Sequence, residues 1–372
     1  MTEAVRSDRR RWWRVVAVTT VVTTLVLALV PGCGLGYLAT QGYYQGQLLA
    51  GRIPVEKAIQ TGTLTPKQKQ ALATIAAVRA YGEARLKMTP TQNYTVINLD
   101  FKADIWNVSA SESLAFVPYT WWFPIVGTIP YKGFFRKADA QSEGERLKGK
   151  GLDVAVRRVA GYSTLGWFKD PILPSMLDYD EPELANLILH ELAHATLFIS
   201  GQVDFNESFA SFVGDTASLR YLADTYGLES ELYLEAIHRQ ADAETFKGYM
   251  HQLYTDLDSL YKSARPDQEK QDAKQARLAR VRDDINALPF LSQRYRNRYR
   301  NPDLNQKPIS LNNADLLQYK RYSSAQSRFE AVLAQQGGDL GKFFEVFRAV
   351  GRSDEPPFKA LERLSGQTEH SP

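Results

Sequence analysis

The stretch His190-Glu191-Leu192-Ala193-His194 has the residue types and the spacing of a metal-dependent hydrolase. Histidines four positions apart lie on one face of a helix, so both imidazoles can bind one metal ion. Glu191 can reach a water on the metal instead of the ion itself, as the general base of a zinc hydrolase must. The motif therefore predicts zinc-assisted hydrolysis, and the alternative is a surface helix with two solvated histidines.

The segment around the motif has the signals of a buried helix. An apolar run over residues 184–198 surrounds the two histidines, and buried imidazoles need a partner. Asp180 is expected to be the N-cap, with Pro182 in the first turn and Glu183 three residues after the cap. A Ser-Gly pair at 200–201 should end the helix. These signals favour the metal site over the solvated alternative.

A second helical stretch, residues 206–215, carries the candidate for a third ligand. A catalytic zinc takes three protein ligands and keeps one position open for water. Glu207 is the first candidate and Asp204 is its rival. Because the connection is short, we expect the two helices to run antiparallel. The face that carries Glu207 is otherwise made of small residues, which would let it press against the first helix: Ala210, Ser211 and Gly214.

H-E-L-A-H followed by F-N-E-S-F-A resembles the gluzincin metallopeptidases and, more narrowly, the putative aminopeptidase family of bacterial lipoproteins. Residues 122–135, 161–171 and 311–315 also resemble segments of that family, so the resemblance covers most of the mature chain. It implies a zinc-dependent aminopeptidase that acts on a peptide or protein substrate. Carried over residue by residue, it implies zinc ligands at His190, His194 and Glu207, and a general base at Glu191.

The expected fold class is α+β. A zincin-like core should occupy residues 65–225, with a small sheet, the H-E-x-x-H helix and the following Glu-bearing helix, and residues 226–372 should be mostly helical. Residues 94–100, 113–117 and 153–162 are strand-like. In the zinc peptidases that the chain resembles, an edge strand lies beside the cleft and the substrate backbone adds to it. We expect residues 154–162 to be that strand.

Two tyrosines are candidates for the hydrogen-bond donor that stabilises the oxyanion formed during hydrolysis. Tyr162 ends the predicted edge strand, and Tyr322 lies in the C-terminal helices. An aminopeptidase also needs an acidic group that captures the free amine of its substrate. Several carboxylates could serve, and the sequence does not choose among them: Asp170, Asp178, Asp180 and Glu181.

Two other functions stay open at this point. An endopeptidase could use the same fold and the same residues. A non-catalytic lipoprotein could instead use zinc to stabilise its fold. A closed structural site would need a fourth ligand, and the only cysteine of the chain, Cys33, lies far from the motif.

The N-terminus has the pattern of an export signal. Five arginines within residues 1–14 precede an uncharged apolar run over residues 15–30, which is shorter than the roughly 20 residues of a membrane span. Val30-Pro31-Gly32-Cys33 resembles a lipobox, with proline in place of the usual small residue. We expect a signal over residues 1–33 and lipidation of Cys33, and the alternative is an uncleaved anchor. Either would hold the chain on the membrane of a bacterial cell envelope, facing the periplasm.

Composition and the remaining segments add smaller expectations. With 372 residues, 44% of them hydrophobic, the chain should fold into a globular protein, and a net charge of +3 does not argue for a nucleic-acid partner. Residues 34–64 are expected to be a tether and a short helix. Residues 293–301 interleave cations with aromatic rings, and we interpret them as a polar loop. The last twenty or so residues are expected to be an irregular tail.

Overall fold

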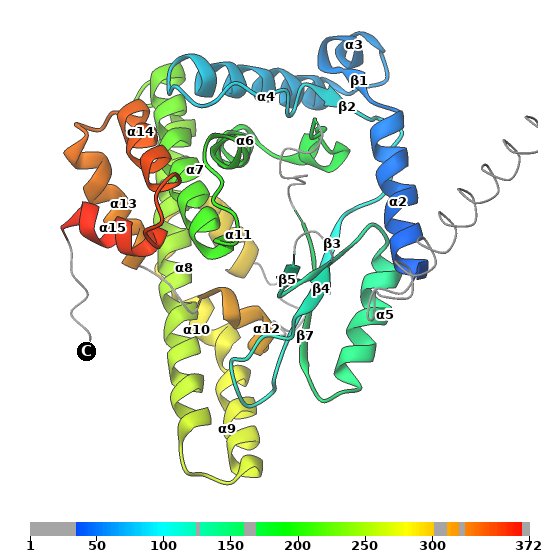
Figure 1. Ribbon diagram of the computed structural model, residues 1–372, viewed down its shortest axis with the longest axis vertical. Coiled ribbons are helices and arrows are strands. Elements are labelled where there is room, and N and C mark those ends of the chain that lie inside the picture. Colours follow the sequence, from blue (N-terminus) through cyan, green and yellow to red (C-terminus); the bar gives the residue numbers. More distant parts are fainter. Residues whose placement is uncertain (1–34, 124–126, 160–168, 301–310, 320–323, 367–372) are drawn as a thin grey trace, which may run out of the picture.

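Two antiparallel helices lie at the centre of the molecule: α6, Glu181–Thr196, and α7, Val203–Tyr226 (Figure 1). The computed structural model describes residues 35–123, 127–159, 169–300, 311–319 and 324–366. The predicted start of α6 is confirmed, because the Asp180 side chain accepts from the Glu183 N–H and the Glu183 side chain accepts from the Asp180 N–H. The helix ends at Thr196, a few residues before the predicted Ser-Gly pair.

Aromatic side chains hold α7 against the C-terminal helices. Helix α4, Pro66–Ala84, packs on α6, while α13, Ser324–Gln335, packs on α7 and α14, Leu340–Val350. Each fully buried side chain of this kind contributes roughly 1.5–3 kcal/mol. The rings that meet between α7, α13 and α14 are all buried: Phe205, Phe209, Phe212, Phe329, Phe343 and Phe347.

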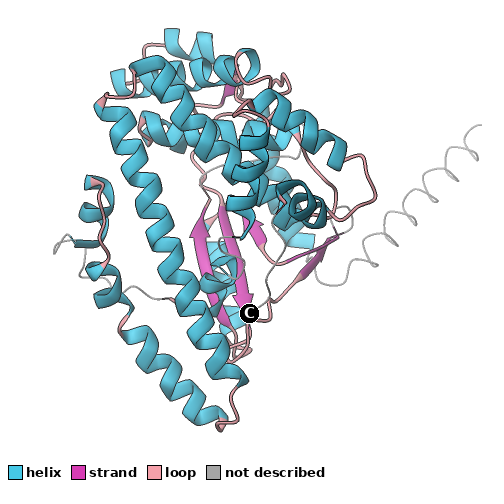
Figure 2. Cartoon of the chain, turned by 90° about the vertical axis from the view of Figure 1, so that its left-hand side faces the viewer, coloured by secondary structure: helices cyan, strands magenta, loops and turns pink. Residues whose placement is uncertain are grey.

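The largest sheet has three antiparallel strands in the order β6-β3-β7: Lys132–Phe134, Trp106–Ser111 and Asp153–Arg158. Helix α5, Lys137–Lys148, packs on this sheet through Ala140 and Leu147. Two smaller sheets pair β4, Trp121–Phe123, with β5, Gly127–Ile129, and β1, Ile53–Pro54, with β2, Val96–Ile97. The protein is thus α+β and mostly helical (Figure 2).

The strand predicted over residues 113–117 is wrong. This segment is a turn after β3, and side chains rather than a neighbouring strand bind its carbonyl groups. Ser111 Oγ donates to the carbonyls of Ala115 and Val117. Asn313 Nδ2 donates to the carbonyl of Ser113 at 3.1 Å. The sequence pattern did not predict this because Asn313 is 200 residues away.

A long helical hairpin is attached to the sheet by polar contacts. Helix α8, Glu231–Lys262, is followed by α9, Asp267–Ala279, and α10, Val281–Ala287 (Figure 1). Lys274 of α9 is almost completely buried and lies 2.6 Å from Asp153 of β7. The short helix α12, Asn313–Leu316, packs on the same strand, and its Asn313 accepts a hydrogen bond from Tyr261 of α8 at 2.7 Å.

Three segments are more ordered than the sequence suggested. Helix α2, Leu35–Ala50, occupies much of the expected tether and completely buries Leu48, and the short helix α3, Val55–Gln60, follows. The expected polar loop is helix α11, Gln293–Arg300. The expected tail contains α15, Pro357–Ser365, which buries its apolar face against α13. Within the described residues, no helix is both long enough and apolar enough to cross a membrane.

Candidate metal centre

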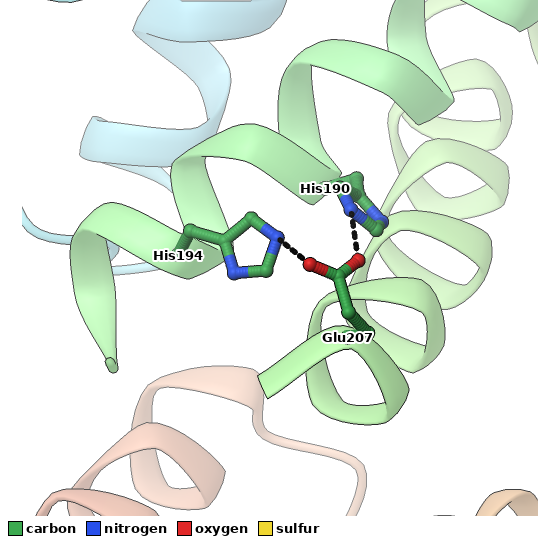
Figure 3. Close-up of side chains that lie close together, drawn as sticks. All are labelled: His190, His194 and Glu207. Carbon is green, nitrogen blue, oxygen red and sulfur yellow. Dashed lines mark ion pairs between the residues drawn. The ribbon is translucent and has the colours of Figure 1, made fainter. Parts of the chain in front are cut away.

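Three side chains converge where α6 meets the first turns of α7 (Figure 3). His190 Nε2 lies 3.7 Å from Glu207 Oε2, and His194 Nε2 lies 3.6 Å from Glu207 Oε1. One ligand atom from each of the three lies within 4.8 Å of the other two. The two histidine side chains are 20% and 12% exposed, whereas that of Glu207 is 59% exposed. The cluster is therefore walled by the helices on one side and accessible on the other.

The close approach of the two helices depends on Gly214. A Cβ atom at this position would lie 3.0 Å from His190 Cβ and 3.1 Å from the carbonyl oxygen of Asn186. Larger side chains here would therefore push α7 away from the metal helix. The connection between the helices is clamped as well, because Asn206 accepts from the Ile199 N–H and donates to the Ile199 carbonyl, at 2.9 and 2.8 Å. This clamp fixes the backbone directly before Glu207.

Replacing Gly214 with alanine should loosen the cluster. The added methyl group must displace His190 or the α6 backbone, so we expect a loss of stability of about 1–3 kcal/mol and weaker zinc binding. Chemical denaturation and zinc competition with a chelator measure the two effects. Gly42→Ala is the matched control, since a Cβ at Gly42 meets nothing within 4 Å. A Gly214→Ala protein that matches the control in both assays would show that close packing is not required.

Glu191 is placed beside the cluster without joining it. Burial raises the pKa of its carboxyl group to about 7, and the nearby charges of Glu207 and Asp170 act in the same direction. Tyr94, which is 1% exposed, hydrogen-bonds Glu191. The Tyr94 backbone has a φ of 58°, in the left-handed region, and its N–H donates to the Asp170 carbonyl at 2.7 Å. Sequence reasoning missed Tyr94, because nothing in the local pattern links it to a motif almost a hundred residues away.

The charge state of His194 suits metal binding, but the surroundings of its second ring nitrogen are unusual for a metal ligand. Burial lowers the pKa of His194 to about 4, so its imidazole is neutral near pH 7, and a neutral imidazole is the form that binds metal ions. His194 Nδ1 is buried without a hydrogen-bond partner among the described residues. A histidine that binds a metal through one ring nitrogen usually donates a hydrogen bond from the other. His194 departs from this arrangement at Nδ1.

The donor set fits a catalytic zinc ion. Two imidazole nitrogens and one carboxylate are the protein ligands of a zinc site that keeps an open position. Within the described part of the chain, no fourth histidine, cysteine or carboxylate belongs to this group. Asp204, the rival ligand, is exposed and lies outside the group.

The other predicted site residues are placed as follows. Tyr162, Tyr322 and Cys33 lie outside the described residues. Of the carboxylates considered for amine capture, Asp170 is buried near Glu191, while Asp180 caps α6 and pairs with Arg239 at 2.7 Å. Glu181 accepts hydrogen bonds from Tyr221 and Tyr226, and Asp178 is exposed at the end of the short 3-10 helix Pro174–Asp178 that precedes α6.

Two hollows adjoin the cluster. One, of about 790 Å³, is lined by His190 and Glu191, and the other, of about 650 Å³, is lined by Glu207. Both are also lined by Ala243 of α8 and by Tyr295 and Arg298 of α11. The accessible side of the cluster therefore faces two neighbouring hollows, and α11 forms a wall common to both.

Helix α11 is held at this wall by a buried carboxylate. Asp242 of α8 is 1% exposed and accepts from the backbone N–H groups of Leu291 and Ser292, each at 2.7 Å. Arg294 of α11 contacts Glu183 and lies 3.6 Å from Asp180, at the start of the metal helix. The sequence predicted a loop here because the acceptor that starts α11 comes from a helix fifty residues earlier.

Comparison with known proteins gives one match. A family model described as "Putative aminopeptidase" matches residues 36–360 of this chain. No curated protein matches, and no solved structure matches.

Proposed function

The chain belongs to the family described as "Putative aminopeptidase", and from that premise we propose that it is a zinc-dependent hydrolase of peptide bonds with a zincin-like core. The observation that carries the proposal is the convergence of His190, His194 and Glu207 within 4.8 Å, with Glu191 beside them. The open side of the cluster supports a catalytic rather than a structural ion, since a structural site is closed by a fourth ligand. The more specific activity that we propose is that of an aminopeptidase.

In this mechanism the chain supplies three metal ligands and a general base. A zinc ion held by His190, His194 and Glu207 would polarise the scissile carbonyl and lower the pKa of water towards about 7. Glu191 accepts the proton of the attacking water and passes it to the leaving amine. Tyr94 orients Glu191 through their hydrogen bond. Tyr162 and Tyr322 remain our candidates for the oxyanion donor.

The end of β7 offers a site for the substrate backbone. Among the described residues, strand β7 pairs with one strand, β3, on one side. On its other side, the carbonyl of Val154 accepts from Asn312 Nδ2 at 2.9 Å, so the first part of this edge is occupied. Arg158 and Val159 at the other end line the hollow that also contains His190. We propose that a peptide adds to the sheet at this end, where its carbonyl groups can approach the cluster.

An endopeptidase is the second candidate. It is favoured by the two neighbouring hollows, one beside His190 and Glu191 and one beside Glu207, which together give room for a longer substrate chain. Nothing in the carboxylates named above singles out one that would capture a free amine. An aminopeptidase cleaves the first peptide bond and an endopeptidase an internal one, so only the endopeptidase tolerates a blocked N-terminus.

The N-terminal pattern supports a location at a membrane. We propose that the chain is exported and held on the outer side of a bacterial membrane, facing the periplasm, by a lipid on Cys33 or by an uncleaved anchor. The basic segment, the apolar run and the single cysteine carry this proposal.

A set of paired peptides tests the proposed activity. The full chain in uncharged detergent should cleave a mixed peptide pool, and a zinc chelator should abolish the cleavage. Free N-termini should be preferred over acetylated ones by at least about tenfold, because an ionised amine makes charge-assisted contacts that an amide cannot. Equal cleavage of acetylated peptides would instead establish an endopeptidase. A chain that cleaves nothing but unfolds when zinc is removed would be the non-catalytic lipoprotein.

A further inference from the structure

A third hollow, of about 820 Å³, lies between α2, β4, β6 and α5 and shares no lining residue with the two hollows beside the metal cluster. We call it the N-terminal hollow. Its α2 wall begins at Gly36, and its opposite wall is formed by α5 and the turn after it, up to Lys150. In Figure 1, α2 and α5 lie on the opposite side of the molecule from α13 and α14. Neither the peptidase mechanism nor the family match assigns a role to this hollow.

The hollow has more positive than negative charge. Four cations and two carboxylates line it, which leaves an excess of two positive charges. Arg136 is paired with Asp139. Glu143 must serve both Arg146, at 2.8 Å, and Lys132, at 3.9 Å, and it also accepts from Trp121 Nε1 at 3.0 Å. One carboxylate cannot neutralise two cations.

Lys132 is the most unusual of these cations. Its side chain is 8% exposed, and within the described residues its only carboxylate partner is the shared and distant Glu143. Its ammonium lies 4.2 Å from the centre of the Tyr37 ring and 5.6 Å from that of Phe134. A buried ammonium with so little compensation costs free energy unless an anion joins it.

Lys150 provides a second cation at the rim. Its ammonium lies 5.5 Å from the centre of the Tyr119 ring and has no carboxylate partner in the described part of the chain. Trp122 is 52% exposed on the same rim. Tryptophan and tyrosine beside lysine and arginine are the residues that favour the interface between a membrane and water. The composition of the hollow thus matches a ligand with an anionic head and an apolar body.

The position of the hollow gives it access to such a ligand. Gly36 is three residues after Cys33, and three residues span at most about 11 Å. If Cys33 is at the membrane surface, as we propose, the α2 wall of the hollow begins within about 11 Å of that surface.

We propose that the N-terminal hollow binds the phosphate of an anionic phospholipid, through Lys132 and Lys150, with Trp122 at the acyl boundary. The proposal rests in part on the proposed membrane attachment, and it is independent of peptidase activity. Binding here would hold the folded part in one orientation on the membrane.

Short-chain lipids test the proposal on the full chain in uncharged detergent. Calorimetric titration with dihexanoyl phosphatidylglycerol should show saturable binding at least about tenfold tighter than with dihexanoyl phosphatidylcholine, because each nearby cation strengthens binding of an anionic lipid about fivefold. Glycerol 3-phosphate should bind more weakly than phosphatidylglycerol, since it has no acyl chains. Equal affinity for the two lipids would overturn the proposal. So would glycerol 3-phosphate binding as tightly as phosphatidylglycerol, which would indicate a site for free phosphate.

Variants localise the binding. Lys150→Gln should weaken binding of phosphatidylglycerol about fivefold, and Lys132→Met should weaken it further if circular dichroism shows an unchanged fold. Lys148→Gln is the matched control, because Lys148 is an exposed lysine on α5 that pairs with Glu145 and does not line the hollow. If Lys150→Gln binds as the control does, the hollow is not the lipid site, whatever the peptidase assays show.

Discussion

The Glu191→Gln protein is expected to hydrolyse peptides at least about a hundredfold more slowly than the natural chain and to bind zinc equally well. General acid–base catalysis contributes roughly 10²–10⁴-fold to the rate of such reactions. Glutamine has the shape of glutamate but cannot accept the proton. The carboxylate is outside the ligand group, so its removal leaves the three ligands in place. Steady-state kinetics and a zinc assay on the same preparation measure both effects.

The fold should not suffer from this change. The Glu191 carboxyl group is buried close to two other carboxylates, which disfavours its charged form. A neutral amide removes that repulsion, so we expect a Tm within a few degrees of the natural chain. Asp204→Asn is the matched control, because it neutralises an exposed carboxylate in the first turn of α7 that is not part of the ligand group. Cleavage by Glu191→Gln at the rate of the control would exclude Glu191 as the base.

The second large effect concerns the metal itself. The natural chain should purify with about one zinc ion, and Glu207→Ala or His194→Ala should lose most of it. Loss of a residue that only orients a ligand already costs about 10–100-fold in affinity, so loss of a ligand should cost more than a hundredfold. Peptidase activity should fall in parallel. Zinc content after dialysis and competition with a chelator measure the affinity.

Asp204 again provides the comparison. Asp204→Ala removes the other carboxylate of the same helix start, and we expect it to keep its zinc. If Asp204→Ala loses the ion while Glu207→Ala retains it, the assignment of the third ligand is wrong. If neither variant changes the zinc content, the ion binds elsewhere and the proposed centre fails with it.

The sequence by itself determined the local parts of this site. The two histidines share a face of α6 because they are four residues apart, and the capping box of Asp180 and Glu183 is a contact over three residues. The short connection predicted that α7 returns along α6. The small residue Gly214 on the face of Glu207 indicated that the two helices could approach closely, and the structure has that close contact. All of these features are encoded within about thirty neighbouring residues.

Only the tertiary structure decided what surrounds the site. Tyr94 contacts Glu191, Asp242 starts helix α11 beside the hollows, and Asn313 holds the turn after β3 through contacts over 50 to 200 residues of sequence. The sequence predicts an irregular tail where helix α15 lies. The apolar face of this helix is covered by α13 and not by residues adjacent to it in the sequence. Periodicity and capping report on residues a few positions apart. A hydrogen bond or a packed ring between distant segments leaves no such local trace, and it forms only when the core brings those segments together.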